Sequence, residues 1–304
     1  TIKQSCRYEG LDDYYKARAV CINLSETGER QQCNSAAIQA RSDAYETCGE
    51  QREARLAACQ LLGEGRYDPE VEPHMFDGNF ANPSAPNPYF PLKIGNRWEY
   101  RGAGEAISVE VLNRTKLIDE LTCVVVRDRV LQDGDLVEDT DDWFAQKRNG
   151  DVFYCGEEVK DYESFDGDRP RVAELTSRDG SFKHDRDGDV GGIAFLGHPV
   201  AGMTYRQEFS VANAEDMAQV VVANYRYGMN PTFDRNVPPR LANLMCGGDC
   251  VITKEFSPVE PGKFVYKYYA RGIGFFLETK PDNNDVLQLT SCNFDGHCAQ
   301  LPQP

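Results

Sequence analysis

The first 65 residues carry a helical pattern of apolar positions. In residues 11–22, LDDYYKARAVCI, apolar and aromatic residues recur three or four positions apart, and alanine and cysteine continue this spacing in residues 31–62. The segment between them, NLSETGER, is rich in turn residues, and Gly63 and Gly65 end the second pattern. We therefore predict a helical hairpin within residues 1–65.

Four cysteines predict how the two helices pair. Cys6 and Cys21 are 15 residues apart, and so are Cys33 and Cys48. In an antiparallel hairpin, Cys21 would meet Cys33 near the turn and Cys6 would meet Cys48 at the open end. These disulfides would stabilise a unit too small to fold by burial alone. Cys59 has no partner in this scheme.

Residues 66–91 lack any periodic pattern. They contain six prolines and several Asn, Asp and Gly residues, which is typical of a linker or an extended arm. Four aromatic residues in this segment, Phe76, Phe80, Tyr89 and Phe90, favour an arm that packs on another surface.

From residue 92 to residue 290 the pattern changes to short alternating or β-branched runs, such as AISVEVLNR, TCVVVRDRVL and QVVVANYRY. Turn sequences such as QDGD, RNGD and EPGK separate these runs. The predicted fold class is mainly β, an antiparallel meander that forms a barrel, roll or sandwich. The helical hairpin precedes this domain, and a Cys-containing tail, residues 291–304, follows it.

The net charge limits the kinds of partner. With 49 acidic and 33 basic residues the formal charge is -16, which repels nucleic-acid phosphates and anionic lipids. We expect no nucleic acid partner. We also expect no membrane span, since no segment approaches the roughly 20 apolar residues that one requires. The negative charge favours divalent cations as partners.

Eleven cysteines in 304 residues predict an oxidising compartment, so we expect an extracytoplasmic protein that is secreted, periplasmic or at the cell surface. The chain begins TIKQSC, as a mature chain would after removal of a signal peptide. Cys123 and Cys155 lie in expected strands and could form a cross-strand disulfide, or Cys123 could be a buried free thiol. Because the count is odd, at least one cysteine is free or joined to another molecule.

Cys246, Cys250, Cys292 and Cys298, together with His297, could in principle supply the ligands of a zinc site. The spacings in CGGDC and CNFDGHC differ from those of close zinc pairs, and an exported chain oxidises such cysteines. We therefore expect these four cysteines to form disulfides, without zinc. The chain has no C-x-x-C-H sequence, which excludes covalently attached haem.

Several long motifs occur in a recognisable order: NPYFPLKIGNRWEY, TCVVVRDRV, DWFAQKRNGDVFY, TYRQEF, AEDMAQV and TKEFSPVEPGKFVYKYYARGIGFFLE. Across residues 66–280 the chain resembles an uncharacterised family of secreted bacterial β-rich proteins. The resemblance implies export and a β fold, without an activity. The chain departs from the family at Cys155, where an aromatic residue is expected, and at an inserted stretch that includes CGGDC.

An acidic stretch raises the question of calcium. In FKHDRDGDVGG, Asp185, Asp187 and Asp189 fit the first three ligand positions of an EF-hand loop, but Val190 and Leu196 replace its Gly and Glu. The stretch is therefore either a different calcium site or an Asp-Gly turn. Three other acidic stretches are expected to be solvated turns: EDTDD (138–142), FDGDR (165–169) and DNND (282–285).

No nucleophile motif accompanies the four histidines, so the sequence favours a protein without enzymatic activity. We expect a structural, self-assembling or adhesive subunit of an extracellular surface, with contacts between copies. If Asp185, Asp187 and Asp189 form a calcium site and not a turn, calcium would also stabilise this subunit. The alternative is a ligand-binding or carbohydrate-active β domain that uses acidic residues in its interior. The residues proposed for that interior are Trp143, Tyr205, Glu208, Glu215 and Asp216.

Overall fold

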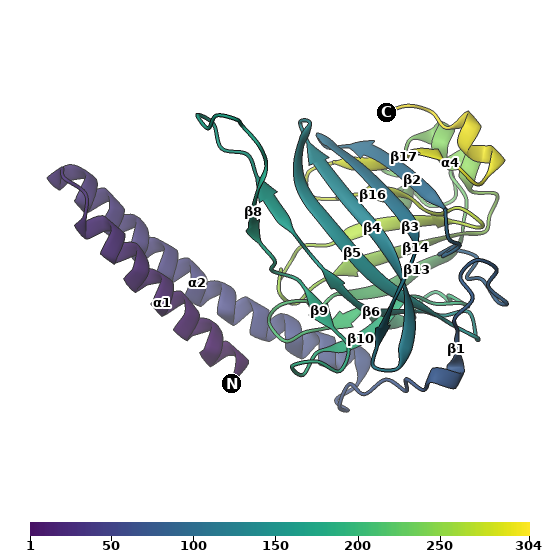
Figure 1. The fold of residues 1–304 in the computed structure, drawn as a ribbon, viewed down its shortest axis with the longest axis horizontal. Helices are drawn as coiled ribbons and strands as arrows, with labels where there is room; N and C mark the ends of the chain where they lie inside the picture. The colour runs from purple at the N-terminus through teal and green to yellow at the C-terminus, as the bar shows by residue number, and fades with distance from the viewer. The chain divides into compact units, whose positions relative to one another are not determined.

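A computed structural model describes residues 1–304, and its contacts divide the chain into two compact units (Figure 1). Unit 1 comprises Thr1–Gly65 and Pro258–Lys263, and unit 2 comprises Arg66–Ser257 and Phe264–Pro304. None of the helices combines the length and the apolar character that crossing a membrane would require.

Unit 1 contains two antiparallel helices, α1 (Ile2–Ile22) and α2 (Thr27–Leu62). Their connecting turn is fixed by Arg30, whose guanidinium group donates to the carbonyl oxygens of Leu24 and Ser25 at 2.7 Å each. Helix α2 ends at Gly63, where a φ of 91° favours glycine over residues with a side chain.

The two disulfides predicted for the hairpin are confirmed. Cys21 pairs with Cys33 near the turn, and Cys6 pairs with Cys48 toward the open end. Few other residues of the helices are buried, and these are small: Gly10, Ala37 and Ala58. Because so little apolar surface is buried between the helices, the disulfides contribute a large part of their stability.

Unit 2 consists mainly of short and medium-length strands. They are β1 (Phe76–Asp77), β2 (Arg97–Gly102), β3 (Glu105–Ile118), β4 (Leu121–Gln132), β5 (Asp135–Lys147), β6 (Val152–Glu158), β7 (Asp161–Glu163), β8 (Glu174–Ser177), β9 (Phe182–Lys183), β10 (Val190–Phe195), β11 (Thr204–Arg206), β12 (Glu208–Phe209), β13 (Met217–Tyr225), β14 (Cys250–Phe256), β15 (Val265–Ala270), β16 (Gly274–Thr279) and β17 (Val286–Cys292).

These strands form a nearly closed antiparallel barrel, which confirms the predicted mainly β fold class. Strands β2 to β6 pair in chain order, strands β13 to β17 do the same, and β17 pairs with β2. On the other side, β6 pairs with β10. Strands β11 and β12, on either side of Gln207, complete the ring because β12 pairs with β10 and β11 pairs with β13.

The Pro-rich arm, residues 66–91, packs on its own unit. It contains the short 3₁₀ helix η1 (Pro73–Met75) and strand β1, which pairs with β5. Phe76, Phe80 and Tyr89 of the arm are buried. The arm is therefore part of the β unit in this conformation and is not extended from it.

Besides η1, unit 2 contains three short helices. They are α3 (Pro231–Asp234), α4 (Pro239–Met245) and the 3₁₀ helix η2 (Gly296–Gln300). Leu241 and Ala242 of α4 are fully buried in the same apolar cluster as Tyr225 and Ile252.

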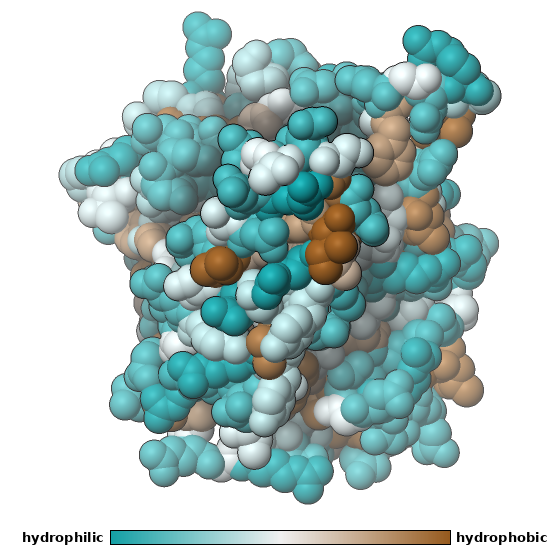
Figure 2. Space-filling view, turned by 90° about the vertical axis from the view of Figure 1, so that its left-hand side faces the viewer, coloured by the Kyte–Doolittle hydropathy of each residue, from teal (hydrophilic) through white to brown (hydrophobic).

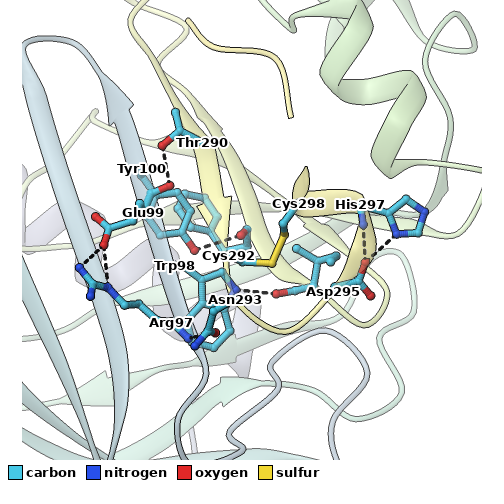
Figure 3. Close-up of a disulfide and its surroundings, with 12 residues drawn as sticks. Arg97, Trp98, Glu99, Tyr100, Thr290, Cys292, Asn293, Asp295, His297 and Cys298 are labelled. Atoms are coloured by element: carbon cyan, nitrogen blue, oxygen red, sulfur yellow. Dashed lines mark hydrogen bonds and ion pairs between the residues drawn. A yellow bond between two sulfur atoms is a disulfide. The ribbon is translucent and has the colours of Figure 1, made fainter. Parts of the chain in front are cut away.

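A disulfide between Cys292 and Cys298 fixes the C-terminal tail to the end of β17 (Figure 3). Beside it, the indole nitrogen of Trp98 donates to the carbonyl oxygen of Ile273 at 2.8 Å. The hydroxyl of Tyr100 donates to the carbonyl oxygen of Phe275 at 3.1 Å. These bonds orient the two aromatic rings of β2.

Two further disulfides lie within unit 2, Cys123–Cys155 and Cys246–Cys250, and Cys59 is free and exposed. The chain thus contains five disulfides, which are rare in reducing compartments. The protein is extracytoplasmic.

Candidate functional site

Unit 2 contains two adjoining, partly open pockets, which we call the two lobes of its cavity. The apolar lobe has a volume of about 250 Å³, and its walls include Trp98, Tyr100, Val126 and Phe275. The acidic lobe has a volume of about 240 Å³, and four carboxyl groups line it: Glu157, Glu208, Asp216 and Glu255. Four residues line both lobes: Phe90, Phe144, Lys267 and Tyr269. We treat the lobes as parts of one candidate binding site.

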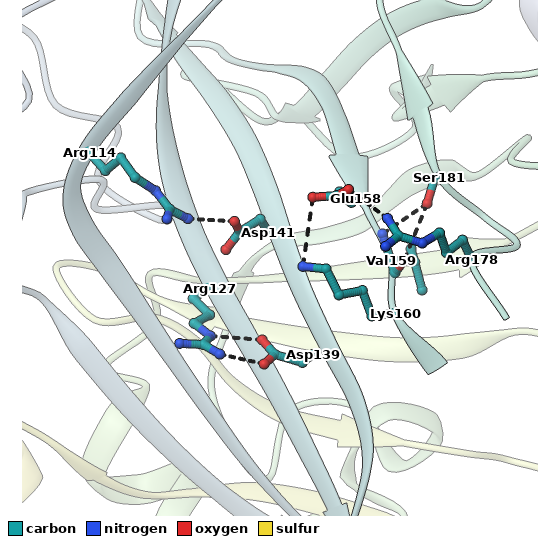
Figure 4. A network of polar contacts seen from close by, with 9 residues as sticks. All are labelled: Arg114, Arg127, Asp139, Asp141, Glu158, Val159, Lys160, Arg178 and Ser181. Carbon is teal, nitrogen blue, oxygen red and sulfur yellow. Dashed lines mark hydrogen bonds and ion pairs between the residues drawn. The ribbon is translucent and has the colours of Figure 1, made fainter. Parts of the chain in front are cut away.

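Strand β5 carries carboxylates on both of its faces. Asp139 pairs with Arg127 and Asp141 pairs with Arg114, in the network of outer charges that Figure 4 shows. Side chains alternate along a strand, so Asp142 takes the opposite face from Asp141 and lines the apolar lobe. The same alternation separates the charged outer surface from the acidic interior.

Asp142 is the best-connected carboxyl group of the apolar lobe. Its Oδ1 atom accepts a short hydrogen bond from the hydroxyl of Tyr154, which lines the acidic lobe. Burial, together with the nearby charges of Glu138 and Asp141, raises the pKa of Asp142 to about 7. The hydrogen bond from Tyr154 acts in the opposite direction. Asp142 therefore changes its protonation near neutral pH.

The pKa values of Glu157 and Glu208 are shifted in the same direction as that of Asp142. Burial raises the pKa of both carboxyl groups well above the usual range, and the charge of Asp142 contributes to each rise. For Glu208 the charge of Asp216 is the second cause after burial. Burial and the neighbouring carboxyl groups therefore favour the protonated form of both side chains.

Lys267 is the one cationic residue that lines the cavity. Its Nζ atom lies 2.8 Å from Oε2 of Glu255, whose other oxygen accepts bonds from the hydroxyls of Tyr269 and Thr253 at 2.9 and 2.8 Å. Burial lowers the pKa of Lys267, but the charges of Glu255 and Glu278 more than offset this, and its pKa is raised. Glu255 and Lys267 therefore form a fixed ion pair.

Asp128 of β4 has an unusual position in the apolar lobe. Its Oδ1 atom is buried and has no hydrogen-bond partner. Burial and the charges of Asp142 and Glu138 raise the pKa of Asp128 well above its usual range. A buried polar atom without a partner costs stability.

The structure places two of the five residues proposed for the interior on the cavity. Glu208 and Asp216 line the acidic lobe, where the backbone N–H of Gln207 donates to the carbonyl oxygen of Asp216 at 2.8 Å. Tyr205 is buried nearby, in a cluster that includes Tyr269, and its hydroxyl has no hydrogen-bond partner.

The other two residues lie elsewhere. Trp143 directly precedes Phe144 on β5, so its ring occupies the opposite face, beneath the Nζ atom of Lys116 at 3.7 Å from the ring centroid. Glu215 belongs to the turn before β13, where its Oε1 atom accepts from the backbone N–H of Ala212 at 2.7 Å. Neither side chain lines the cavity.

The acidic stretch FKHDRDGDVGG forms the turn between β9 and β10. Asp185 and Asp187 are exposed, with positive φ angles of 56° and 58°, and the backbone N–H of Asp185 donates to the carbonyl oxygen of Asp189 at 3.0 Å. No three acidic, His or Cys side chains converge here as metal ligands. Calcium binding stays a prediction.

Several residues of the cavity were not predicted from the sequence. EDTDD was expected to be a solvated turn, and this expectation is wrong, because residues 138–142 lie within β5. The alternation of DTDDWF could have identified Asp142 and Phe144 as neighbours on one face. In the same way, the alternation of side chains in KFVYKYYA could have placed Lys267 and Tyr269 on one face of a strand.

No protein-family model and no curated protein matches this chain. Among solved structures, a "putative lipoprotein" from Parabacteroides distasonis is similar to it, with a TM-score of 0.33 and 12% sequence identity. The similarity covers 68% of this chain and 99% of the other. A likeness at this level assigns no function.

Proposed function

We propose that this extracytoplasmic protein binds a small organic molecule in the two-lobed cavity of its β unit. The observation that carries the proposal is that an apolar and a polar lobe adjoin each other and share four lining residues: Phe90, Phe144, Lys267 and Tyr269. Binding sites for small molecules characteristically combine apolar walls with a few convergent polar groups whose pKa values are shifted.

Filling the cavity should remove this function. Ala194 lines the acidic lobe, so the added volume of Ala194→Leu should exclude a ligand. The matched control is Ala36→Leu, on the exposed surface of α2. We expect fragments that bind the wild-type protein, measured by calorimetry, to bind Ala36→Leu equally and to bind Ala194→Leu about ten-fold more weakly or worse.

Circular dichroism would establish that Ala194→Leu keeps its β fold. Equal affinity of the folded Ala194→Leu and wild-type proteins for every fragment would contradict the proposal. So would the absence of binding by any fragment in a broad set of neutral, acidic and basic compounds.

A second candidate function is the structural, self-assembling or adhesive role, which the hairpin favours. Its helices expose large apolar side chains separated by polar ones: Tyr8, Tyr15, Val20, Ile22, Ile38, Leu56 and Leu61. Apolar residues also appear singly among hydrophilic ones on the face that Figure 2 shows. The exposed thiol of Cys59 could join two copies. Against strand addition, the arm is packed on its own unit.

Light scattering of the native protein tests this role. Assembly through the hairpin predicts a mass that is a multiple of 34.1 kDa, and assembly through Cys59 predicts that Cys59→Ser or a reductant lowers that mass. Comparing calcium with a chelator tests the predicted contribution of Asp185, Asp187 and Asp189. A monomer at high concentration under all conditions would exclude self-assembly.

A further inference from the structure

The cavity has an unbalanced set of charges. Two carboxyl groups line the apolar lobe, Asp128 and Asp142, and four line the acidic lobe, whereas Lys267 is the single cation in either. Lys267 is already paired with Glu255 at 2.8 Å. The lining of the cavity therefore contains six carboxyl groups and one ammonium group.

A second observation concerns Asp128, which lines the apolar lobe. Its Oδ1 atom is buried and accepts no hydrogen bond from the protein. An N–H donor of a ligand in this lobe would offset the burial of the Asp128 carboxyl group, whereas an anionic ligand would increase the repulsion.

The aromatic residues also favour a positive ligand. Phe90, Phe144 and Tyr269 lie where the lobes meet, and the faces of aromatic rings attract cations and disfavour anions. Beyond them, Trp98, Tyr100 and Phe275 provide an apolar surface.

We propose that the molecule bound in the cavity is an organic amine, with its protonated nitrogen among Asp128, Asp142 and Glu208 and its apolar part against the rings of the apolar lobe. This inference rests on the proposed function and specifies its ligand class. The charge imbalance, the unpartnered Asp128 oxygen and the aromatic junction each favour the same class.

The test uses the intact protein and matched probes. Three sets, built on phenyl, cyclohexyl and hexyl groups, each contain an amine, the corresponding alcohol and the corresponding carboxylic acid. We expect the amine of at least one set to bind about ten-fold more tightly than its alcohol, and the acids to bind most weakly, as measured by calorimetry at pH 7.5.

Two isosteric variants assign the effect to the cavity. Glu208→Gln should weaken amine binding about ten-fold and leave alcohol binding unchanged, whereas Asp139→Asn, on the outer face, should change neither. Alcohols or acids that bind as tightly as the amines would overturn the amine inference while leaving cavity binding intact. If no probe binds and the broad fragment set also fails, the proposed function itself is wrong.

Discussion

Replacing Lys267 by Met should destabilise the β unit by about 3 kcal/mol at pH 8, measured as the free energy of unfolding in urea. The substitution removes the cation 2.8 Å from Glu255 and leaves that carboxylate buried among other acids. The hydrogen bonds from Thr253 and Tyr269 remain but cannot balance its charge.

The matched control is Lys263→Met. Lys263 pairs with Glu260 at 3.1 Å, but both side chains are more than half exposed, so its loss should change stability by less than about 1 kcal/mol. Adding Glu255→Gln to Lys267→Met should restore most of the lost stability, since the buried charge is gone. A Lys267→Met protein as stable as the wild type at pH 8 would show that the charge of Glu255 does not need Lys267 for the folded state to be stable.

Asp142→Asn should stabilise the β unit at pH 8 by up to about 4 kcal/mol and have little effect near pH 4. The pKa of Asp142 is about 7 in the folded state and near 3.8 when unperturbed. Between these two pH values Asp142 is ionised in the unfolded chain and protonated in the folded protein. The folded state therefore loses stability as the pH rises from about 4 to about 7. Asn cannot ionise and still accepts the Tyr154 hydrogen bond.

Other titratable groups lie in the same interior. They come from four strands: Asp128, Tyr154, Glu157, Glu208 and Lys267. The difference between Asp142→Asn and wild type, taken at each pH from unfolding curves, isolates the contribution of Asp142.

Asp139→Asn provides the contrasting control on the same strand. The hydrogen bond from Arg127 lowers the pKa of Asp139, so its charge stabilises the folded state and its removal should reduce stability at pH 8. Equal and parallel pH profiles for the two variants would refute the assignment of opposite environments to the two faces of β5.

Local patterns were sufficient to predict much of the fold. The equal spacings from Cys6 to Cys21 and from Cys33 to Cys48 predicted both disulfides of the hairpin, because an antiparallel helix pair admits one consistent pairing. Alternation and turn residues predicted antiparallel strands. They could not predict that β11 and β12 would bridge β10 and β13, because ring closure depends on contacts between distant segments.

The cavity was harder to predict for the same reason. Glu208 and Asp216 are close in sequence, and the sequence analysis grouped them. Asp128, Glu157 and Lys267 come from strands that meet only when the barrel closes. Trp143 was also proposed for the interior, but its place on β5 turns its side chain away from the cavity and into an apolar cluster with Cys123 and Cys155.

A crystal structure of the protein with a bound amine probe tests the central claim most directly. We expect density for the probe inside the barrel, with its nitrogen within hydrogen-bonding distance of Asp128, Asp142 or Glu208 and its apolar part beside Phe144. A probe that binds at saturating concentration only on the outer surface, and not in the cavity, would contradict the proposed binding site.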